Sequence, residues 1–217
     1  MGIAYNTSIV RDGLVLHLDA ANVKSYPGTG TTWFDLSGNG NHGTLANGVG
    51  YSANNNGTMS FDGVDDRVST PQLLGTSVTL SVWFNTDNIA KSQNGIFTRN
   101  SANLIQLNNN STTTWWPDVR TSPVSFSTPV LQDVWYNICI TQSGTTCYAY
   151  LNGEEIYFDD STVEFFPYNG TAGCSIGSYG SSRYFSGFIS SPSVYNRALT
   201  PEEIKQNFFA YRGRYGI

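Results

Sequence analysis

The chain has 217 residues, of which only 12% are charged and 14% are aromatic, and its formal net charge is −5. This composition excludes intrinsic disorder, because disordered segments combine high charge with few aromatic residues. The acidic balance excludes a strongly basic face, so we expect no nucleic-acid partner and no binding to an anionic membrane. At this length a single domain is expected, since all-β sandwiches commonly reach it undivided.

The two ends of the chain are set apart from the folded domain in this prediction. Residues 1–12 form an N-terminal arm, residues 13–211 the domain, and residues 212–217 a basic, aromatic C-terminal tail that is a candidate for docking on a partner. The N-terminal residues contain no basic segment followed by an apolar one, so we expect no signal peptide. No apolar run approaches the ~18 residues of a transmembrane segment.

Along the chain, short apolar runs separated by Gly, Asn, Asp and Ser predict an all-β protein. Leu14, Leu16 and Leu18 alternate with Val15, His17 and Asp19, which indicates a strand with apolar residues on both faces. Leu80, Val82 and Phe84 share one face of a second predicted strand. A third strand presents Val134, Tyr136, Ile138 and Ile140 on its inward face. Asn152-Gly153 is typical of a two-residue hairpin turn. The strand spacing predicts two stacked antiparallel sheets.

One short helix is predicted at the C-terminus. Thr200, Pro201 and Glu203 form a capping box with Pro at the first helical position. Ile204, Phe208 and Tyr211 then share one face by their spacing.

The three cysteines, Cys139, Cys147 and Cys174, are odd in number. We favour three buried thiols, although Cys139 and Cys147 fall on two strands of one predicted hairpin and a bridge between them stays open. With two histidines in the chain, a zinc site is not expected.

Four segments carry a resemblance to a known family. They are residues 35–43 (DLSGNGNHG), 61–68 (FDGVDDRV), 134–153 with their Trp and Asn-Gly turn, and 194–204 (VYNRALTPEEI). Together they resemble the laminin-G-like, concanavalin-A-like jelly rolls. Residues 12–22, 25–28, 33–38 and 201–217 resemble modules of tailed-bacteriophage structural proteins. The resemblance implies a two-sheet antiparallel jelly-roll sandwich closed by one short C-terminal helix. The same sandwich serves lectins, adhesins, virion proteins and glycosidases, so it does not name the function.

An enzyme is not expected. Jelly-roll glucanases carry their catalytic acids in an alternating Glu-x-Asp-x-x-Glu pattern on one strand, and the sequence contains no such pattern. Neither histidine has a local Ser or Cys context typical of nucleophilic catalysis.

A structural calcium ion is the one cofactor for which the sequence offers ligands. Clustered Asp and Asn in tight loops supply the oxygen ligands that Ca²⁺ prefers. The candidate ligands are Asp35, Asn39, Asp62 and Asp66, and many relatives of the resembled fold carry such an ion. The alternative, which we favour, is that Asp35 and Asp62 hold turns through backbone amides while Asp66 pairs with Arg67 or solvent.

Carbohydrate binding requires exposed aromatic faces beside hydrogen-bonding partners. Two segments offer them, one containing Trp115, Trp116 and Asp118, and the other containing Tyr179, Arg183 and Tyr184. Adjacent tryptophans on a strand point to opposite faces, so the alternative is that one is in the core and the other at a sheet or subunit contact.

Two functions follow from these predictions. The first is a non-enzymatic virion structural protein that decorates a capsid or tail, contacts other virion proteins and copies of itself, and in addition binds host glycans. Its location would be the surface of the particle. The second is a soluble lectin or adhesin module that binds carbohydrate without a virion.

Overall fold

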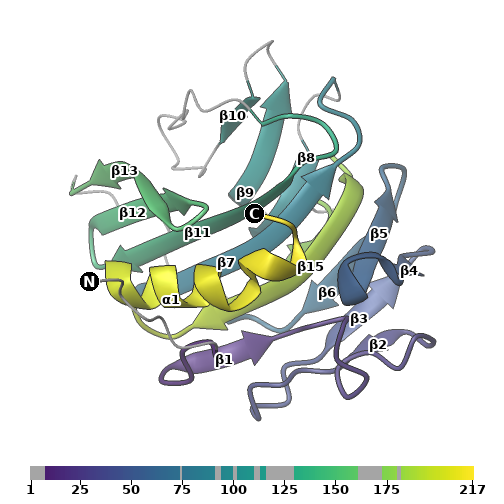
Figure 1. The fold of residues 1–217 in the computed structure, drawn as a ribbon, viewed down its shortest axis with the longest axis horizontal. Coiled ribbons are helices and arrows are strands. Elements are labelled where there is room, and N and C mark those ends of the chain that lie inside the picture. Colours follow the sequence, from purple (N-terminus) through teal and green to yellow (C-terminus); the bar gives the residue numbers. More distant parts are fainter. Residues whose placement is uncertain are drawn as a thin grey trace.

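The computed structural model describes residues 8–73, 75–90, 94–99, 102–109, 113–115, 130–160, 173–179 and 182–217. Within these residues, two antiparallel sheets stack into a sandwich, and one helix lies across the outer face of one sheet (Figure 1). The predicted jelly-roll sandwich with one C-terminal helix is therefore confirmed.

Sheet A has eight described strands, in the order β13 (Glu154–Asp159), β12 (Thr146–Leu151), β11 (Trp135–Ser143), β7 (Ser77–Thr86), β15 (Ser186–Tyr195), β5 (Thr58–Asp62) and β4 (Gly50–Ser52), with β1 (Leu14–His17) also paired to β15. Sheet B has seven, in the order β10 (Thr113–Trp115), β9 (Ala102–Asn109), β8 (Asn94–Arg99), β14 (Cys174–Ile176), β6 (Arg67–Thr70), β3 (Gly43–Ala46) and β2 (Thr32–Trp33). Two single-turn 3-10 helices, η1 (Asn54–Asn56) and η2 (Arg212–Arg214), complete the described elements.

The main core lies between the two sheets and is built by alternation. Leu80, Val82 and Phe84 of β7 all contribute to it, and each is fully buried. Trp33 of sheet B lies in the same core. Val134, predicted to share the inward face of the next strand, lies just before β11 and is 37% exposed, so that part of the prediction is wrong.

A second apolar layer separates sheet A from the helix α1 (Pro201–Tyr211). The capping box predicted at Thr200 and Glu203 is present. Trp83 points to this layer, with its ring centroid 5.6 Å from that of Phe208 and 4.2 Å from that of Tyr215. In Figure 1, α1 crosses β7 and β15, and the chain end returns over the same sheet. Of residues 212–217, Tyr215 is buried against Trp83 of β7, and Arg214 Nη2 donates to Ser190 Oγ of β15 at 3.2 Å, so these two residues pack against sheet A.

The hairpin of β11 and β12 places its two cysteines in different layers. Cys139 lies opposite Tyr150, whereas Cys147 lies opposite Gln142. Cys139 faces the layer under α1, and Cys147 faces the main core. All three thiols are free and buried, as favoured from the sequence, and Cys139 and Cys147 are not bridged.

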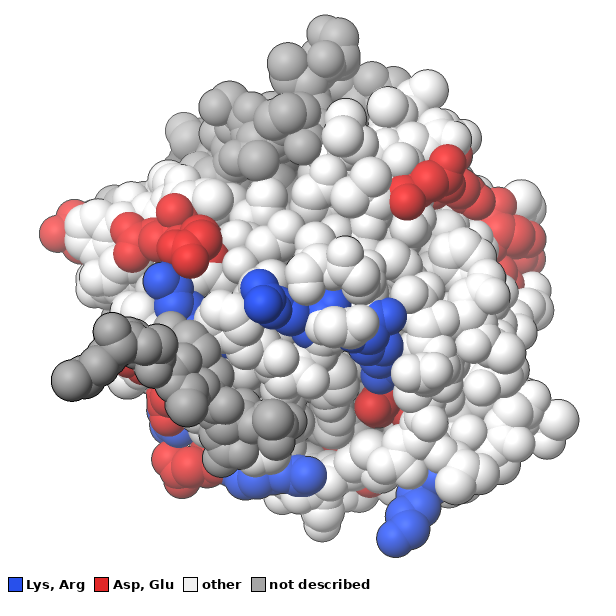
Figure 2. Space-filling view, viewed as in Figure 1, with Lys and Arg blue, Asp and Glu red and all other residues white. Residues whose placement is uncertain are grey.

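The face that carries α1 is mostly uncharged, and its acidic and basic side chains lie in a few small groups (Figure 2). No helix among the described residues is both long enough and apolar enough to cross a membrane.

Candidate functional site

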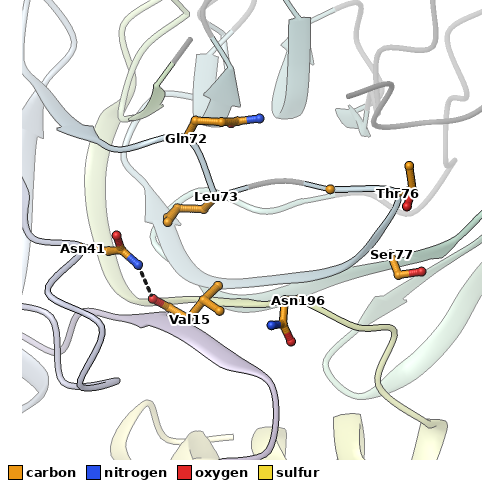
Figure 3. Close-up of a pocket in the computed structure, with 8 residues that line it drawn as sticks. Val15, Asn41, Gln72, Leu73, Thr76, Ser77 and Asn196 are labelled. Atoms are coloured by element: carbon orange, nitrogen blue, oxygen red, sulfur yellow. Dashed lines mark hydrogen bonds between the residues drawn. The ribbon is translucent and has the colours of Figure 1, made fainter. Parts of the chain in front are cut away.

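A pocket of about 480 Å³ opens where β1 meets the segment that joins β6 to β7. Its volume lies in the range typical of small-molecule sites. Figure 3 shows Gln72, Leu73 and Thr76 along one side, with Val15 and Asn196 along the other. The complete set of described lining residues is Val15, Asn41, Gln72, Leu73, Gly75, Thr76, Ser77 and Asn196. None of these residues is charged, and five of them carry a side-chain amide or hydroxyl group.

Asp35 shapes the loop that brings Asn41 to this pocket. Its Oδ1 accepts hydrogen bonds from the backbone amides of His17 and Ser37, both at 2.9 Å. Its Oδ2 accepts from the Ser37 hydroxyl at 2.6 Å and from the Asn41 amide at 3.1 Å. Partial burial alone would raise the pKa of Asp35, but these hydrogen bonds outweigh it and hold the pKa below its usual value.

Two asparagine side chains attach the same loop to β1. Asn39 donates through Nδ2 to the Leu14 carbonyl at 3.1 Å. Asn41 donates through Nδ2 to the Val15 carbonyl at 2.8 Å, the bond drawn in Figure 3. Of the four predicted calcium ligands, Asp35 and Asn39 therefore serve to hold this loop, as the alternative interpretation expected for Asp35.

The other two predicted ligands, Asp62 and Asp66, lie at the turn from β5 to β6 together with Asp65. One carboxylate oxygen from each of the three residues lies within 4.8 Å of the others. Asp62 Oδ1 accepts from the Val64 amide at 2.8 Å, the turn contact expected for Asp62. Burial raises the pKa of Asp66, and the negative charges of Asp62 and Asp65 raise it further.

The segment predicted to bind carbohydrate around Tyr179 is described at Tyr179 and at residues 182–184. Tyr179 and Ser182 exchange two backbone hydrogen bonds of 3.0 Å. The Arg183 guanidinium lies 4.6 Å from the centroid of the Tyr179 ring, and its Nη1 donates to Gln106 Oε1 at 3.5 Å. Tyr184 is half-buried. The structure thus brings Arg183 to Tyr179 and adds Gln106, which the sequence did not single out.

The second predicted carbohydrate segment is described only in part. The backbone of Trp115 ends β10, opposite Leu107 of β9. The side chain of Trp115, together with Trp116 and Asp118, lies outside the described residues.

A Ser–His pair that no sequence motif signals lies under α1. Ser193 Oγ is 2.9 Å from His17 Nδ1, and Tyr211 Oη is 3.0 Å from His17 Nε2. His17 and Ser193 are 3% and 6% exposed, so a substrate has no access to the hydroxyl in this arrangement. Burial lowers the pKa of His17 to about 4.

The sequence also did not identify the pocket residues other than Asn41 as candidate site residues. Gln72, Leu73 and Thr76 form no recognisable motif, and Asn196 is more than 100 residues away from them in the chain. Only the position of Asn41, within the Asp- and Asn-rich segment 35–43, was a usable signal.

Several solved structures share the fold. Domain 4 of AbnA, an extracellular arabinanase from Geobacillus stearothermophilus, solved in complex with arabinotriose, has a TM-score of 0.69 at 15% identity and covers 88% of this chain and 96% of its own. Trypanosoma rangeli sialidase in complex with sialic acid has a TM-score of 0.71 at 16% identity and covers 94% of this chain, which spans 34% of the sialidase. The receptor-binding domain of botulinum neurotoxin type G has a TM-score of 0.67 at 14% identity, and the match covers 91% of this chain and 51% of that domain's chain.

At these identities the similarities establish the fold alone. No curated protein sequence matches the chain. The family assignment comes from the sequence itself, because residues 62–205, well over half of the chain, match one family. The chain belongs to the Concanavalin A-like lectin/glucanases superfamily.

Proposed function

We propose that this chain is a carbohydrate-binding module that holds a neutral glycan in the pocket between β1 and the segment joining β6 to β7. The observation that carries the proposal is the lining of the pocket, in which amide and hydroxyl side chains surround a space of about 480 Å³. Sugar hydroxyl groups both donate and accept hydrogen bonds, as do the amides of Asn41, Gln72 and Asn196 and the hydroxyls of Thr76 and Ser77.

The lining also favours a neutral sugar over an anionic one. No Lys or Arg is present among the described lining residues, whereas carboxylated sugars are usually bound through charge-assisted hydrogen bonds. Val15 and Leu73 offer apolar contacts for the C–H groups of a sugar ring. The AbnA domain solved with arabinotriose, a neutral trisaccharide, is a precedent for such a ligand on this fold.

Binding without hydrolysis is part of the proposal. A glycosidase needs two carboxyl groups that flank the scissile bond. The described residues that line the pocket include no carboxylate. His17 and Ser193 are buried, and neither is among the described residues that line this pocket, so the pair offers no alternative nucleophile there.

The test is calorimetric titration of the full chain with neutral oligosaccharides and with a sialylated one. Gln72→Ala is expected to weaken binding of the neutral ligand by about fivefold, because one hydrogen bond is worth about 1 kcal/mol. Gln132→Ala is the matched control, since Gln132 is exposed and does not line the pocket. Arg183→Ala separates this pocket from the Tyr179 segment. A loss only in Arg183→Ala would move the site to that segment, and no binding to any neutral glycan would refute the function.

Attachment to a virus particle is a finer proposal about where the module works. It rests on the sequence stretches that resemble modules of tailed-bacteriophage structural proteins, which are residues 12–22, 25–28, 33–38 and 201–217. Mass spectrometry of particles purified from the native source tests it. Recovery of the chain in stoichiometric amount would support the virion role, and recovery only as free protein would favour a lectin or adhesin module.

A further inference from the structure

The side-chain amide of Asn41 has a fixed orientation at the edge of the glycan pocket. Its Nδ2 donates to the Val15 carbonyl at 2.8 Å, and because a carbonyl can only accept, the nitrogen must be the atom that faces it. The backbone amide of Asn41 is held in turn by Asp35 Oδ2 at 3.1 Å. In Figure 3 the side-chain oxygen of Asn41 points away from the Val15 carbonyl. Asn41 therefore offers a ligand in the pocket a hydrogen-bond acceptor and no side-chain donor.

Two aliphatic side chains form the apolar part of the same pocket. Val15 and Leu73 both pack against the main core and are both half-buried, so the remainder of each side chain is left to line the pocket. The register of β1 against β15 shifts between Leu14 and Leu16, and this irregularity takes Val15 out of the regular pairing. Figure 3 shows Val15 and Leu73 on facing sides of the pocket, with Asn41 beside them.

This apolar lining suits a methyl group better than the flat face of a sugar ring. The C–H face of a sugar packs best on an aromatic ring, which offers a broad, flat apolar surface. The described residues that line the pocket include no aromatic residue. Val15 and Leu73 are branched and aliphatic, so the space between them takes a small, rounded apolar group. A ligand that fits the pocket therefore carries a methyl group close to a hydrogen-bond donor for Asn41.

We infer, on the basis of the proposed function, that the neutral glycan bound in this pocket contains an acetamido sugar such as an N-acetylhexosamine. An acetamido group combines an N–H that donates, a carbonyl that accepts and a methyl group that is apolar. Asn41 Oδ1 accepts from the N–H, and the methyl group lies between Val15 and Leu73. The side-chain amide of Asn196 and the hydroxyl of Thr76, both in the lining, are donors for the carbonyl. A sugar hydroxyl in place of the acetamido group keeps the bond to Asn41 but buries no methyl group.

Calorimetric titration of the full chain with two trisaccharides, triacetylchitotriose and cellotriose, tests this assignment. The two have the same linkage and ring configuration, and they differ only in the acetamido group that replaces one hydroxyl on each ring. We expect triacetylchitotriose to bind at least about fivefold more tightly, which is the gain that burial of one methyl group supplies. Both ligands are uncharged, so a difference in charge cannot cause the preference.

Two variants test whether the preference arises at the apolar side chains of the pocket. Leu73→Ala removes one of them, and Val15→Thr replaces a methyl group of the other with a hydroxyl. Each should reduce the ratio of the two Kd values to about twofold or less. Val15→Thr keeps the β-branched shape that suits β1, so it keeps the test valid even where Leu73→Ala alters its segment. Leu131→Ala is the matched control and should keep the preference, because Leu131 is 58% exposed and does not line the pocket.

The outcomes separate the ligand assignment from the proposed function. Equal or tighter binding of cellotriose would refute the acetamido sugar and leave the proposed function standing, because a neutral glycan is still bound. Binding of another neutral glycan without binding of triacetylchitotriose would have the same meaning. Absence of binding to every neutral glycan would refute both. A preference for triacetylchitotriose that persists in both Leu73→Ala and Val15→Thr would also overturn the assignment, since the acetamido group would then be recognised elsewhere.

Discussion

Replacement of His17 tests how the layer under α1 is held together. His17 bridges Ser193 on β15 and Tyr211 on α1, with ring nitrogens 2.9 Å and 3.0 Å from the two hydroxyl oxygens. A neutral imidazole has one nitrogen that donates and one that accepts, and hydroxyl groups can serve either role. In His17→Gln the amide can keep one such bond but cannot take up a proton.

The expected loss of stability at low pH follows from the pKa of His17, which is lowered from 6.5 to about 4. Burial is the main cause, and the charges of Arg11 and Arg214 add to it against the opposing effects of Asp19 and Asp35. The unfolded chain takes up a proton near pH 6.5 and the folded chain only near pH 4. Stability is therefore complete above pH 6.5 and is lost as the pH falls toward 4. By pH 5 the loss is about 2 kcal/mol.

Urea unfolding at about pH 8 and about pH 5 measures this loss. We expect the unmodified chain and His42→Gln to lose about 2 kcal/mol more between these two values than His17→Gln does. An equal loss in His17→Gln and the unmodified chain would show that His17 is not held neutral, and the reasoning would fail.

Three further substitutions test other parts of the fold. Arg214→Met should lower the free energy of unfolding, measured with urea, by about 3–5 kcal/mol, because it leaves the carboxylate of Asp19, 2.7 Å from Arg214 Nη1, buried without its partner. A second change, Asp19→Asn, should recover part of this loss. No recovery would argue against the charge as the cause. Thr200→Ala should lower the free energy of unfolding, measured by thermal unfolding, by about 1 kcal/mol, because it removes the N-cap of α1. Thr200→Ser should behave like the unmodified chain. An equal loss in both variants would show that the cap is not the cause. Gly187→Ala should lower the free energy of unfolding by more than about 2 kcal/mol, since Gly187 has a φ of 125° and a Cβ there would collide with the Asn85 carbonyl. An unchanged thermal unfolding curve would contradict this geometry.

The sandwich itself could be predicted because its signals are local. The alternation of Leu80, Val82 and Phe84 gives a strand with one face in the core. The turn at Asn152-Gly153 is present, with φ values of 52° and 78° that suit these two residues. The cap of α1 at Thr200 likewise depends only on residues within one turn of the helix.

The candidate sites were only partly predictable, because they are assembled from distant segments. The sequence predicted Asp35, Asn39, Asp62 and Asp66 as one set of ligands. In the structure Asp35 holds its own loop, and Asp62 and Asp66 lie together with Asp65 at the β5–β6 turn. Arg183 and Tyr179 were proposed together and do lie together, since only three residues separate them. Whether either cluster binds a ligand stays a prediction.

By itself the sequence determined the β-sandwich, its closing helix and the family, because periodicity, capping and turn chemistry act over a few residues. The structure was needed to show that Cys139 and Cys147 are unbridged, because they face different layers. The uncharged pocket formed by Val15, Asn41, Gln72 and Asn196 could be found only in the tertiary structure. The same is true of the burial of His17 against Ser193, 176 residues away. Such contacts depend on the packing of sheets and loops, and no spacing along the chain encodes them.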